Sequence, residues 1–591
     1  MKNTKENART EYTRNFTALR GMNPRGSVDD SFFYLENMYV DYEGGGEYVE
    51  SVPGFRKIFS PKEEIHSIGI YGISEGEKSL LIHAGENLYR LPVSERDSNK
   101  KLSPIATLSD TKSRIFSFGK LAFIADGKSL WLVNSDGQVK RISDDTNISS
   151  CTKAAIYDRK LFLAGCPKLP CHLFYSTPLD EENISFSPDA FIKESVSGVP
   201  IRSLLSFGGL LWIFMETDGG EGSIICRKAT PRKHQKYPAI KQFCKIKVLS
   251  DAVVFGGEIH FLSEGGLMAI KNPLPETESK LVHCSMPIDA FICRENFENV
   301  SLGIWMGYLA LSFGERIYLA DSRCTEQYRW YFINGVGGYK NDRRVYRYLS
   351  TEAEGCIIHP CPDGVAEGEI ISHTLPDGRI ICYTHEGENR YGVYPTEELF
   401  GGEFSPAREF VSDGSFLWFA TKDQLYLFNN DKRGTSAEEK AKSDLNNAEN
   451  EPFYKSRIHP DYYSFAGHAP RYAVVTHYDD CGLAANEKSS APDSLFLELS
   501  TFERSSFTLC VMADGVQKSS IKVCPASLNF SDLNFQSIGM HAGEGYRVNL
   551  SERAALWYKK RLVLVGGDFA SPFGIKSVCY RYRLKGEGKK T

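Results

Sequence analysis

The segment from 114 to 142 constrains the fold more than any other part of the chain, because it contains four short strands in succession. Asp-Gly pairs separate some of these strands, and Asp-Gly between apolar runs is among the strongest hairpin signals because glycine tolerates positive φ. The two central strands are almost continuously apolar, which is typical of strands covered on both faces. The segment therefore predicts one blade of a β-propeller. Its strands are expected at Arg114–Phe118, Lys120–Ala125, Ser129–Asn134 and Gln138–Ile142.

A similar hairpin recurs along the chain at nearly constant spacing. Successive first strands are 41, 40, 49, 49, 50 and 108 residues apart, and propeller repeats run at about 40–50 residues, so the last gap holds about two periods. The alternative is a generic all-β protein whose hairpins are alike by composition alone. The spacing favours an all-β chain with a β-propeller of six to eight blades over residues 31–430. The hairpins begin at Leu80, Leu121, Leu161, Leu210, Ile259, Leu309 and Leu417.

Ring closure and the long gap lead to two further expectations. An open ring would leave strand edges unpaired, so N-terminal strands near Met38 or Val49 are expected to close the propeller against its last blade. Residues 321–415 interrupt the repeat and are expected to be an irregular or inserted part. Within them, Gly355–His359 and Glu367–His373 are candidates for a degenerate hairpin.

Length and charge exclude several classes of protein. A chain of 591 residues is long enough for two or more domains with buried cores. Its formal net charge of −5 gives no global electrostatic case for nucleic-acid binding. No apolar run reaches the roughly 18 residues of a membrane-spanning helix, and the N-terminus lacks the apolar core of a signal peptide. The sequence therefore predicts a soluble chain with no recognisable export signal.

The N-terminal region introduces a family resemblance. Residues 1–30 are polar and are expected to form an N-terminal arm or a poorly ordered lead-in. In Phe32–Ile58, an Asn-Met element, a glycine turn and a strand ending in the pattern Ser-x-Pro-Gly-Phe-x-Lys follow one another. This order resembles the entry to the propeller-bearing tail accessory or tail nozzle proteins of short-tailed bacteriophages and related prophage virion proteins. The hairpin Ser79–Leu91 continues the resemblance, which is clearest over 32–91 and weaker through Phe428.

The resemblance implies a function and a set of partners. It implies a structural component of a phage tail, a ring of the nozzle or adaptor type, that continues the DNA exit conduit and assists genome delivery. The expected partners are other copies of the chain in a homo-oligomeric ring, portal or adaptor proteins, other tail proteins and, transiently, the ejected DNA, with no membrane span. The chain would reside in the virion after assembly in the cytoplasm of the bacterial host. The alternative function is a carbohydrate-binding or glycan-cleaving β-propeller on a phage spike or a bacterial surface.

Two basic segments are the candidates for contact with DNA. The segment Tyr328–Tyr339 is rich in aromatic residues and glycine, and three arginines follow it among tyrosines: Arg343, Arg344 and Arg347. Interleaved arginine and tyrosine can stack nucleobases. The favoured interpretation is nevertheless a blade strand whose long side chains extend along its solvent face. The second segment, Arg227–Lys236, is expected to be a solvated loop between blades.

The C-terminal part changes character. Residues 431–452 are charged and almost devoid of large aliphatic residues, so they are expected to be a linker or a mobile loop. Residues 453–591 are expected to form a smaller C-terminal β domain that resembles a sandwich. Its loops include Gly467–Pro470 and Tyr478–Cys481, interpreted as turns that share one loop cluster. Its strands are expected at Arg471–His477, Ser494–Ser500, Phe507–Met512, Ser519–Cys524, Trp557–Val565 and Lys576–Leu584.

Motifs for catalysis are missing from the sequence. Carboxylates such as Glu258, Glu264 and Asp413 are suited to acid–base work, but nothing marks two of them as a pair. Serine elbows, HExxH and P-loop patterns are absent. His260 lies within an apolar strand and is expected to pack inside a blade rather than act as a base. The sequence therefore predicts no catalytic and no cofactor-binding residue, and a protein that is not an enzyme.

The fifteen cysteines are interpreted as mostly buried free thiols. Cys166 and Cys171, like Cys356 and Cys361, have four residues between them, whereas a zinc knuckle usually has two. Many of the others lie within apolar strands. No metal ligand and no cofactor are therefore predicted.

Overall fold

The computed structural model describes residues 11–16, 21–27, 29–42, 48–72, 77–95, 101–179, 184–195, 198–216, 222–230, 237–323, 327–337, 348–349, 370–374, 380–385, 390–394, 406–430, 463, 465, 470–501, 507–523, 546–550, 556–566 and 573–585. The chain divides into two compact units. The larger unit combines residues 1–334 with 407–591, and the smaller unit is Gly335–Pro406.

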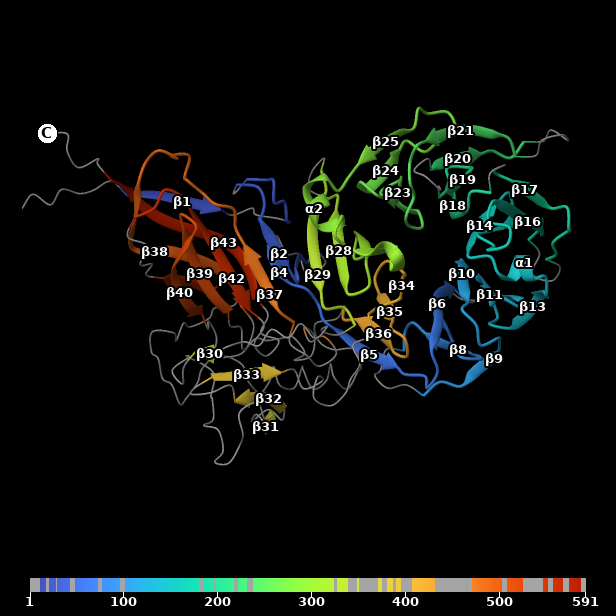
Figure 1. The fold of residues 1–591 in the computed structure, drawn as a ribbon, viewed down its shortest axis with the longest axis horizontal. Coiled ribbons are helices and arrows are strands. Elements are labelled where there is room, and N and C mark those ends of the chain that lie inside the picture. Colours follow the sequence, from blue (N-terminus) through green and yellow to red (C-terminus); the bar gives the residue numbers. More distant parts are fainter. Residues whose placement is uncertain are drawn as a thin grey trace, which may run out of the picture. The chain divides into compact units, whose positions relative to one another are not determined.

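Seven antiparallel blades of four strands each form a propeller in the described part of the larger unit (Figure 1). The first and second blades are β6 (Ile65–Gly72), β7 (Lys78–Ala84), β8 (Asn87–Pro92), β9 (Pro104–Thr107) and β10 (Arg114–Phe118), β11 (Leu121–Ala125), β12 (Leu130–Val133), β13 (Val139–Ser143). The third and fourth are β14 (Lys153–Tyr157), β15 (Lys160–Ala164), β16 (His172–Pro178), β17 (Phe191–Lys193) and β18 (Ile201–Phe207), β19 (Leu210–Met215), β20 (Ser223–Arg227), β21 (Ala239–Cys244). The fifth and sixth are β22 (Val253–Phe255), β23 (Glu258–Ser263), β24 (Gly266–Lys271), β25 (Lys280–His283) and β26 (Ser301–Trp305), β27 (Tyr308–Ser312), β28 (Arg316–Asp321), β29 (Arg329–Asn334). The seventh is β34 (Glu409–Ser412), β35 (Leu417–Ala420), β36 (Leu425–Phe428) and β5 (Phe55–Phe59).

The predicted hairpins are confirmed. Each of the seven supplies the second and third strands of one blade, and the segment 114–142 forms the four strands of the second blade. The propeller therefore has a blade count within the predicted six to eight. The strand Arg329–Asn334 is the fourth strand of the sixth blade, so the predicted blade strand is confirmed, but its four central residues are buried and form no solvent face.

Neighbouring blades pack face to face, which explains why their central strands are apolar on both sides. Between the fourth and fifth blades, Trp212 and Phe214 of β19 join one buried cluster with Ile259 and Phe261 of β23. The rings of Phe214 and Phe261 lie 5.4 Å apart. Burial on both faces removes the polar alternation that a half-exposed strand would show.

The strand that closes the ring is not the predicted one. The closing strand is β5, which pairs antiparallel with β36 and places Phe55 opposite Phe428. The strands near Met38 and Val49, β3 (Met38–Val40) and β4 (Val49–Ser51), pair instead with β29 and with β43 (Phe573–Leu584). The reason is position: β5 directly precedes the first blade, so it reaches the seventh blade where the ring meets.

Among the described residues, the long gap adds no eighth blade to the ring. The sixth and seventh blades are direct neighbours, because the Met306 N–H donates to the Gly414 carbonyl over 2.8 Å. The smaller unit contains its own sheet, in the order β30 (Tyr348–Leu349), β33 (Arg390–Tyr394), β32 (Ile380–His385), β31 (Ile370–Thr374). Of the candidate segments for a degenerate hairpin, only the part of Glu367–His373 from residue 370 onward is described, and it belongs to β31 of this sheet. Gly355–His359 lies outside the described residues.

The C-terminal domain is a two-sheet structure built from both ends of the chain (Figure 1). The first sheet has the order β2 (Tyr34–Glu36), β37 (Tyr472–Val475), β42 (Lys560–Gly566), β39 (Phe507–Ala513), β40 (Val516–Val523). The second continues from the sixth blade through β29, β3, β4 and β43 to β38 (Lys488–Thr501) and β41 (Tyr546–Leu550). The predicted all-β class, a propeller followed by a sandwich-like domain, is thus confirmed. The charged stretch 431–452 lies outside the described residues.

The N-terminal arm is partly a strand. Residues Tyr12–Phe16 form β1, which pairs antiparallel with β43 so that Tyr12 lies opposite Tyr582. The expectation of a poorly ordered lead-in is therefore wrong for these residues. A short polar strand is difficult to recognise when its stabilising partner is a strand at the far end of the sequence.

Candidate functional site

The structure places the candidate carboxylates in separate ion pairs. Glu258 lies 3.6 Å from the ammonium of Lys271, and Glu264 pairs with Lys247. Asp413 caps the turn before β35, where one carboxylate oxygen accepts hydrogen bonds from two backbone N–H groups, and its other oxygen lies 3.3 Å from Lys78 Nζ. Each carboxylate therefore has its own cation, and no two of the three form the close pair that acid–base catalysis needs.

Side chains cross one mouth of the propeller channel. Arg114 at the start of β10 forms an ion pair with Glu409 at the start of β34. Arg114 belongs to the second blade and Glu409 to the seventh, and the first blade lies between these two. Lys153 at the start of β14 likewise lies 2.6 Å from Asp251, which precedes β22 two blades further on. Burial raises the pKa of Glu409 above its ordinary value, although the positive charge of Arg114 opposes the shift. These links bridge blades that are not neighbours and so extend over the channel.

Two histidines among the described residues are fully buried, and His260 is packed within a blade as expected. The Nε2 atom of His260 lies 2.6 Å from the Tyr328 hydroxyl, and Nδ1 of His83 lies 2.7 Å from the Ser113 hydroxyl. Both rings are fully shielded from solvent. Burial lowers the pKa of each histidine to about 4, so both are neutral at neutral pH.

We expect these histidines to make folding stability depend on pH. Between pH 6.5 and 4 these two histidines are protonated in the unfolded chain but remain neutral in the folded chain. Their contribution to the free energy of unfolding is therefore complete above pH 6.5 and decreases as the solution is acidified. The loss at about pH 5 should reach about 2 kcal/mol for each histidine. Urea denaturation at about pH 7.5 and 5 would measure it. The double variant His83→Gln/His260→Gln should lose most of this dependence, and an equal slope in both proteins would contradict the assignment.

The described thiols are free, and many are buried. Burial raises the pKa of Cys226 and of Cys284 to about 12, which keeps both thiols protonated and unreactive. Cys166 and Cys171 are both buried, and Cys356 and Cys361 lie outside the described residues. Across the described part of the chain, no group of three His, Cys, Asp or Glu side chains is placed to hold a metal ion.

The basic segments are only partly described. Arg227 ends β20 and donates two hydrogen bonds to the Glu194 carboxylate, at 2.6 and 2.8 Å. The segment 227–236 connects β20 to β21, so it belongs to a single blade and does not join two blades as predicted. The described residues do not include 231–236 of that loop. They also do not include the predicted arginines Arg343, Arg344 and Arg347.

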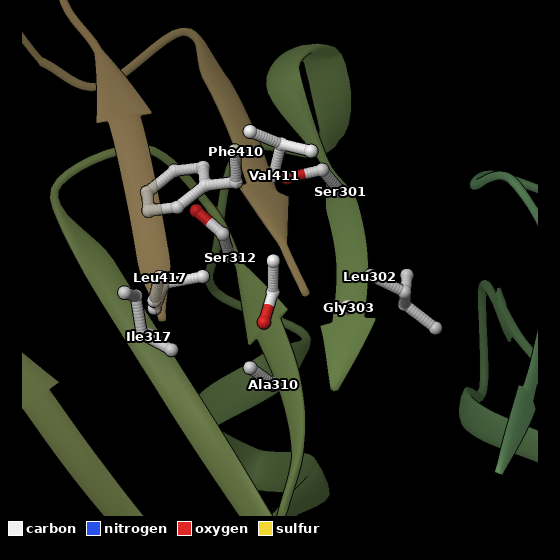
Figure 2. Close-up of a pocket in the computed structure, with 10 residues that line it drawn as sticks. Ser301, Leu302, Gly303, Ala310, Ser312, Ile317, Phe410, Val411 and Leu417 are labelled. Carbon is white, nitrogen blue, oxygen red and sulfur yellow. The ribbon is translucent and has the colours of Figure 1, made fainter. Parts of the chain in front are cut away.

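A small cleft of about 200 Å³ separates the sixth and seventh blades (Figure 2). Figure 2 shows the Phe410 ring on the same side as Leu417 and Ile317, while Leu302 points away from them. The cleft exists because small residues, including Gly303 and serines, line it. It contains hydroxyl groups but no titratable side chain, so it offers no acid–base chemistry.

A larger groove of about 660 Å³ lies between the N-terminal segment and the C-terminal domain. Asp479 is central to it: its carboxylate accepts hydrogen bonds from Tyr580 and from Arg14, the latter over 3.3 Å. Arg14 of β1 also binds Asp29 over 2.6 Å. Burial tends to lower the pKa of Arg14, but the two carboxylates outweigh it and raise the pKa. The arm and the domain are thus joined by a charged network.

The loop Tyr478–Cys481 therefore does more than form a turn. Its turn geometry is present, because Asp479 and Asp480 each accept a backbone N–H two residues on, from Cys481 and Gly482. Sequence reasoning missed the contribution of Arg14, which is 465 residues away from Asp479 along the chain. Gly467–His468–Ala469, the other part of the expected loop cluster, lies outside the described residues.

Comparisons with solved structures find β-propeller and WD40 proteins at low identity and low TM-score. The WD40 domain of SCAP from fission yeast is 9% identical and aligns 64% of this chain with 98% of its own, at a TM-score of 0.36. Virginiamycin B lyase from Staphylococcus aureus is 10% identical, and the alignment covers 64% of this chain and 98% of the lyase at a TM-score of 0.31. BamB from Moraxella catarrhalis is 8% identical over 64% and 90%, at a TM-score of 0.30. No protein-family profile and no curated protein matches the sequence.

The class of the chain therefore follows from its own strand topology. It is a seven-bladed β-propeller joined to a sandwich-like β domain, as far as the described residues extend. Within these residues, no helix has the length and apolar character to cross a membrane.

Proposed function

We propose that the chain is a structural, non-catalytic component of the tail of a short-tailed bacteriophage. It assembles as a homo-oligomeric ring of the nozzle or adaptor type, continues the DNA exit conduit and assists genome delivery. The proposal rests on the resemblance of residues 32–91 to such virion proteins. The structural observation that best supports it is the continuous sheet between the propeller and the C-terminal domain.

That sheet makes the larger unit suitable for a ring. The outer strand of the sixth blade pairs with β3, which pairs with β4, which pairs with β43 of the C-terminal domain. Strand pairing therefore runs from one domain into the other through β29, β3, β4 and β43. A ring subunit needs a contact surface on each flank, and two domains that share one sheet could each supply one of these surfaces.

The ion pairs that cross the mouth of the propeller channel favour a DNA conduit formed between several subunits rather than through the channel of one propeller. Ion pairs such as Arg114–Glu409 and Lys153–Asp251 would have to break to admit a nucleic acid. A lumen enclosed by several copies needs no such rupture. The mildly acidic net charge of −5 suits a wall that DNA must leave, because a strongly basic wall would retain phosphates by counterion release.

The expected result is that purified virions contain this chain in several copies. Quantitative mass spectrometry of particles would give its stoichiometry relative to the portal protein, and negative-stain images would locate the ring at the tail. Particles made without the chain should lack that ring and fail to deliver DNA. Absence of the chain from virions, or a strictly monomeric protein on a cell surface, would contradict the proposal and favour the carbohydrate-binding or glycan-cleaving alternative.

A further inference from the structure

We propose that the groove between the N-terminal segment and the C-terminal domain is a binding site for a neutral saccharide. Its lining includes Phe33, His477, Asp480 and Arg561, together with Arg14 and Asp479 of the charged network. Its volume of about 660 Å³ lies within the range of about 300–1,000 Å³ that is usual for ligand sites. The inference does not depend on the ring function and is tested separately from it.

Arg561 supplies unused hydrogen-bond donors. It lies in β42, and its guanidinium carbon is 4.5 Å from the centre of the Tyr478 ring and 5.7 Å from that of Phe33. Its Nε atom is buried and has no hydrogen-bond partner among the described residues. No carboxylate in the described part of the chain forms an ion pair with it. A buried donor without a partner is costly. The outer guanidinium nitrogens of Arg561 also form no hydrogen bond with a described residue, and they are the donors that a ligand oxygen in the groove would meet.

His477 supplies an unused acceptor. The residue is more than nine-tenths buried, and its Nε2 atom has no partner among the described residues. Burial lowers the pKa of the ring, although a hydrogen bond to the backbone of Asn23 raises it, so the ring is neutral near pH 7. Because that bond uses the protonated nitrogen, we assign the bare nitrogen to Nε2. Nε2 therefore lacks a donor within the protein. The atom has almost no accessible surface, so a ligand hydroxyl supplies the donor when the ring turns toward the groove.

The charge of the groove favours a neutral ligand. Arg14 is already neutralised by Asp29 and Asp479, so it adds no net attraction for anions. The Asp480 carboxylate accepts a backbone N–H but forms no ion pair among the described residues, and it offsets the charge of Arg561. Sugar hydroxyls both donate and accept hydrogen bonds, which matches a lining that presents orphan groups of both kinds.

Phe33 supplies an apolar surface. Its side chain is 37% exposed. Its ring meets the His477 ring edge-on at 5.7 Å, and the guanidinium carbon of Arg561 lies over it, 5.7 Å from the ring centre. An aromatic ring held by such neighbours keeps a fixed orientation, and the exposed part that neither Arg561 nor His477 covers can contact the C–H face of a sugar ring. The combination of one aromatic face with convergent polar groups is the usual composition of a specific small-ligand site.

Saturation-transfer NMR on the full chain would test the site. The probes are chitotetraose, cellotetraose and maltotetraose, with tetragalacturonate and tetraglutamate as acidic comparators. We expect transfer to the ring protons of at least one neutral tetraose at about 1 mM ligand. Arg561→Gln should raise the Kd by about tenfold or more, and Phe33→Ala should raise the Kd by about fivefold.

Matched controls separate the site from general effects. Phe191→Ala removes a phenylalanine of similar exposure, 40%, from the outer strand of the third blade, and Arg141→Gln removes an exposed arginine of the second blade. Neither should change the Kd. Absence of transfer to every neutral tetraose, binding of the acidic comparators only, or equal affinity in Arg561→Gln would each overturn the proposal. If melting shows that Phe33→Ala is unfolded, Arg561→Gln decides the question.

Discussion

Replacing Leu130 with aspartate is expected to lower the free energy of unfolding by more than about 4 kcal/mol, because it places a charge in a strand that is covered on both faces. Leu130 is fully buried in β12. It belongs to a cluster that joins Phe123 of its own blade to Leu161 and Leu163 of the next blade. Neither blade offers the new carboxylate a cation in this cluster, so the charged side chain would separate the two blades or remain unsolvated.

Urea denaturation followed by circular dichroism would measure the change. Gln138→Asp is the matched control: it adds the same charge to the same blade at an exposed position and should shift stability by less than about 0.5 kcal/mol. Where Leu130→Asp cannot be purified folded, Leu130→Ala should still cost about 2–5 kcal/mol. A denaturation midpoint for Leu130→Asp equal to that of the unmodified chain would show that this strand is not in the core.

The second large effect is expected at the closure of the ring. Phe55→Ala should lower the free energy of unfolding by about 3–5 kcal/mol, because it removes a buried aromatic side chain and leaves a cavity. The Phe55 ring lies 4.7 Å from that of Phe465, 5.0 Å from that of Phe419 and 5.4 Å from that of Phe428. It therefore joins the closing strand both to the seventh blade and to Phe465, which lies ahead of β37 in the C-terminal part of the chain.

Hydrogen exchange would distinguish an opened closure from general weakening. Exchange should accelerate first in β5, β35 and β36, where the closing pairs lie, before it rises in the second to fifth blades. Phe191→Ala, at an exposed site on an outer strand, should change stability by less than about 1 kcal/mol. An exchange increase that begins in blades far from β5 would contradict the role of Phe55 as the fastener of the ring.

The blade hairpins could be predicted because their signals are local. In the second blade, one Asp126 oxygen accepts the backbone N–H groups of Lys128 and Ser129 at 2.9 and 2.6 Å, so residues two and three positions apart create the turn. Gly127 adopts a φ of 83°, which glycine tolerates and most residues avoid. The apolar runs on either side are equally local. Turn chemistry and apolar runs therefore determined the hairpins, their repeat and the propeller class from the sequence alone.

Only the tertiary structure decided which distant segments meet. Phe55 and Phe428 pair across most of the chain, and Arg14 reaches Asp479 over 465 positions, so neither contact leaves a periodic pattern in the sequence. The prediction that strands near Met38 close the ring was wrong for this reason. Both β3 and β5 are short strands, and only the tertiary structure shows that β3 pairs with β29 while β5 pairs with β36. The groove likewise combines an N-terminal strand with C-terminal loops. Sequence determines what short segments become, whereas packing among segments determines where the ring closes and where a ligand site forms.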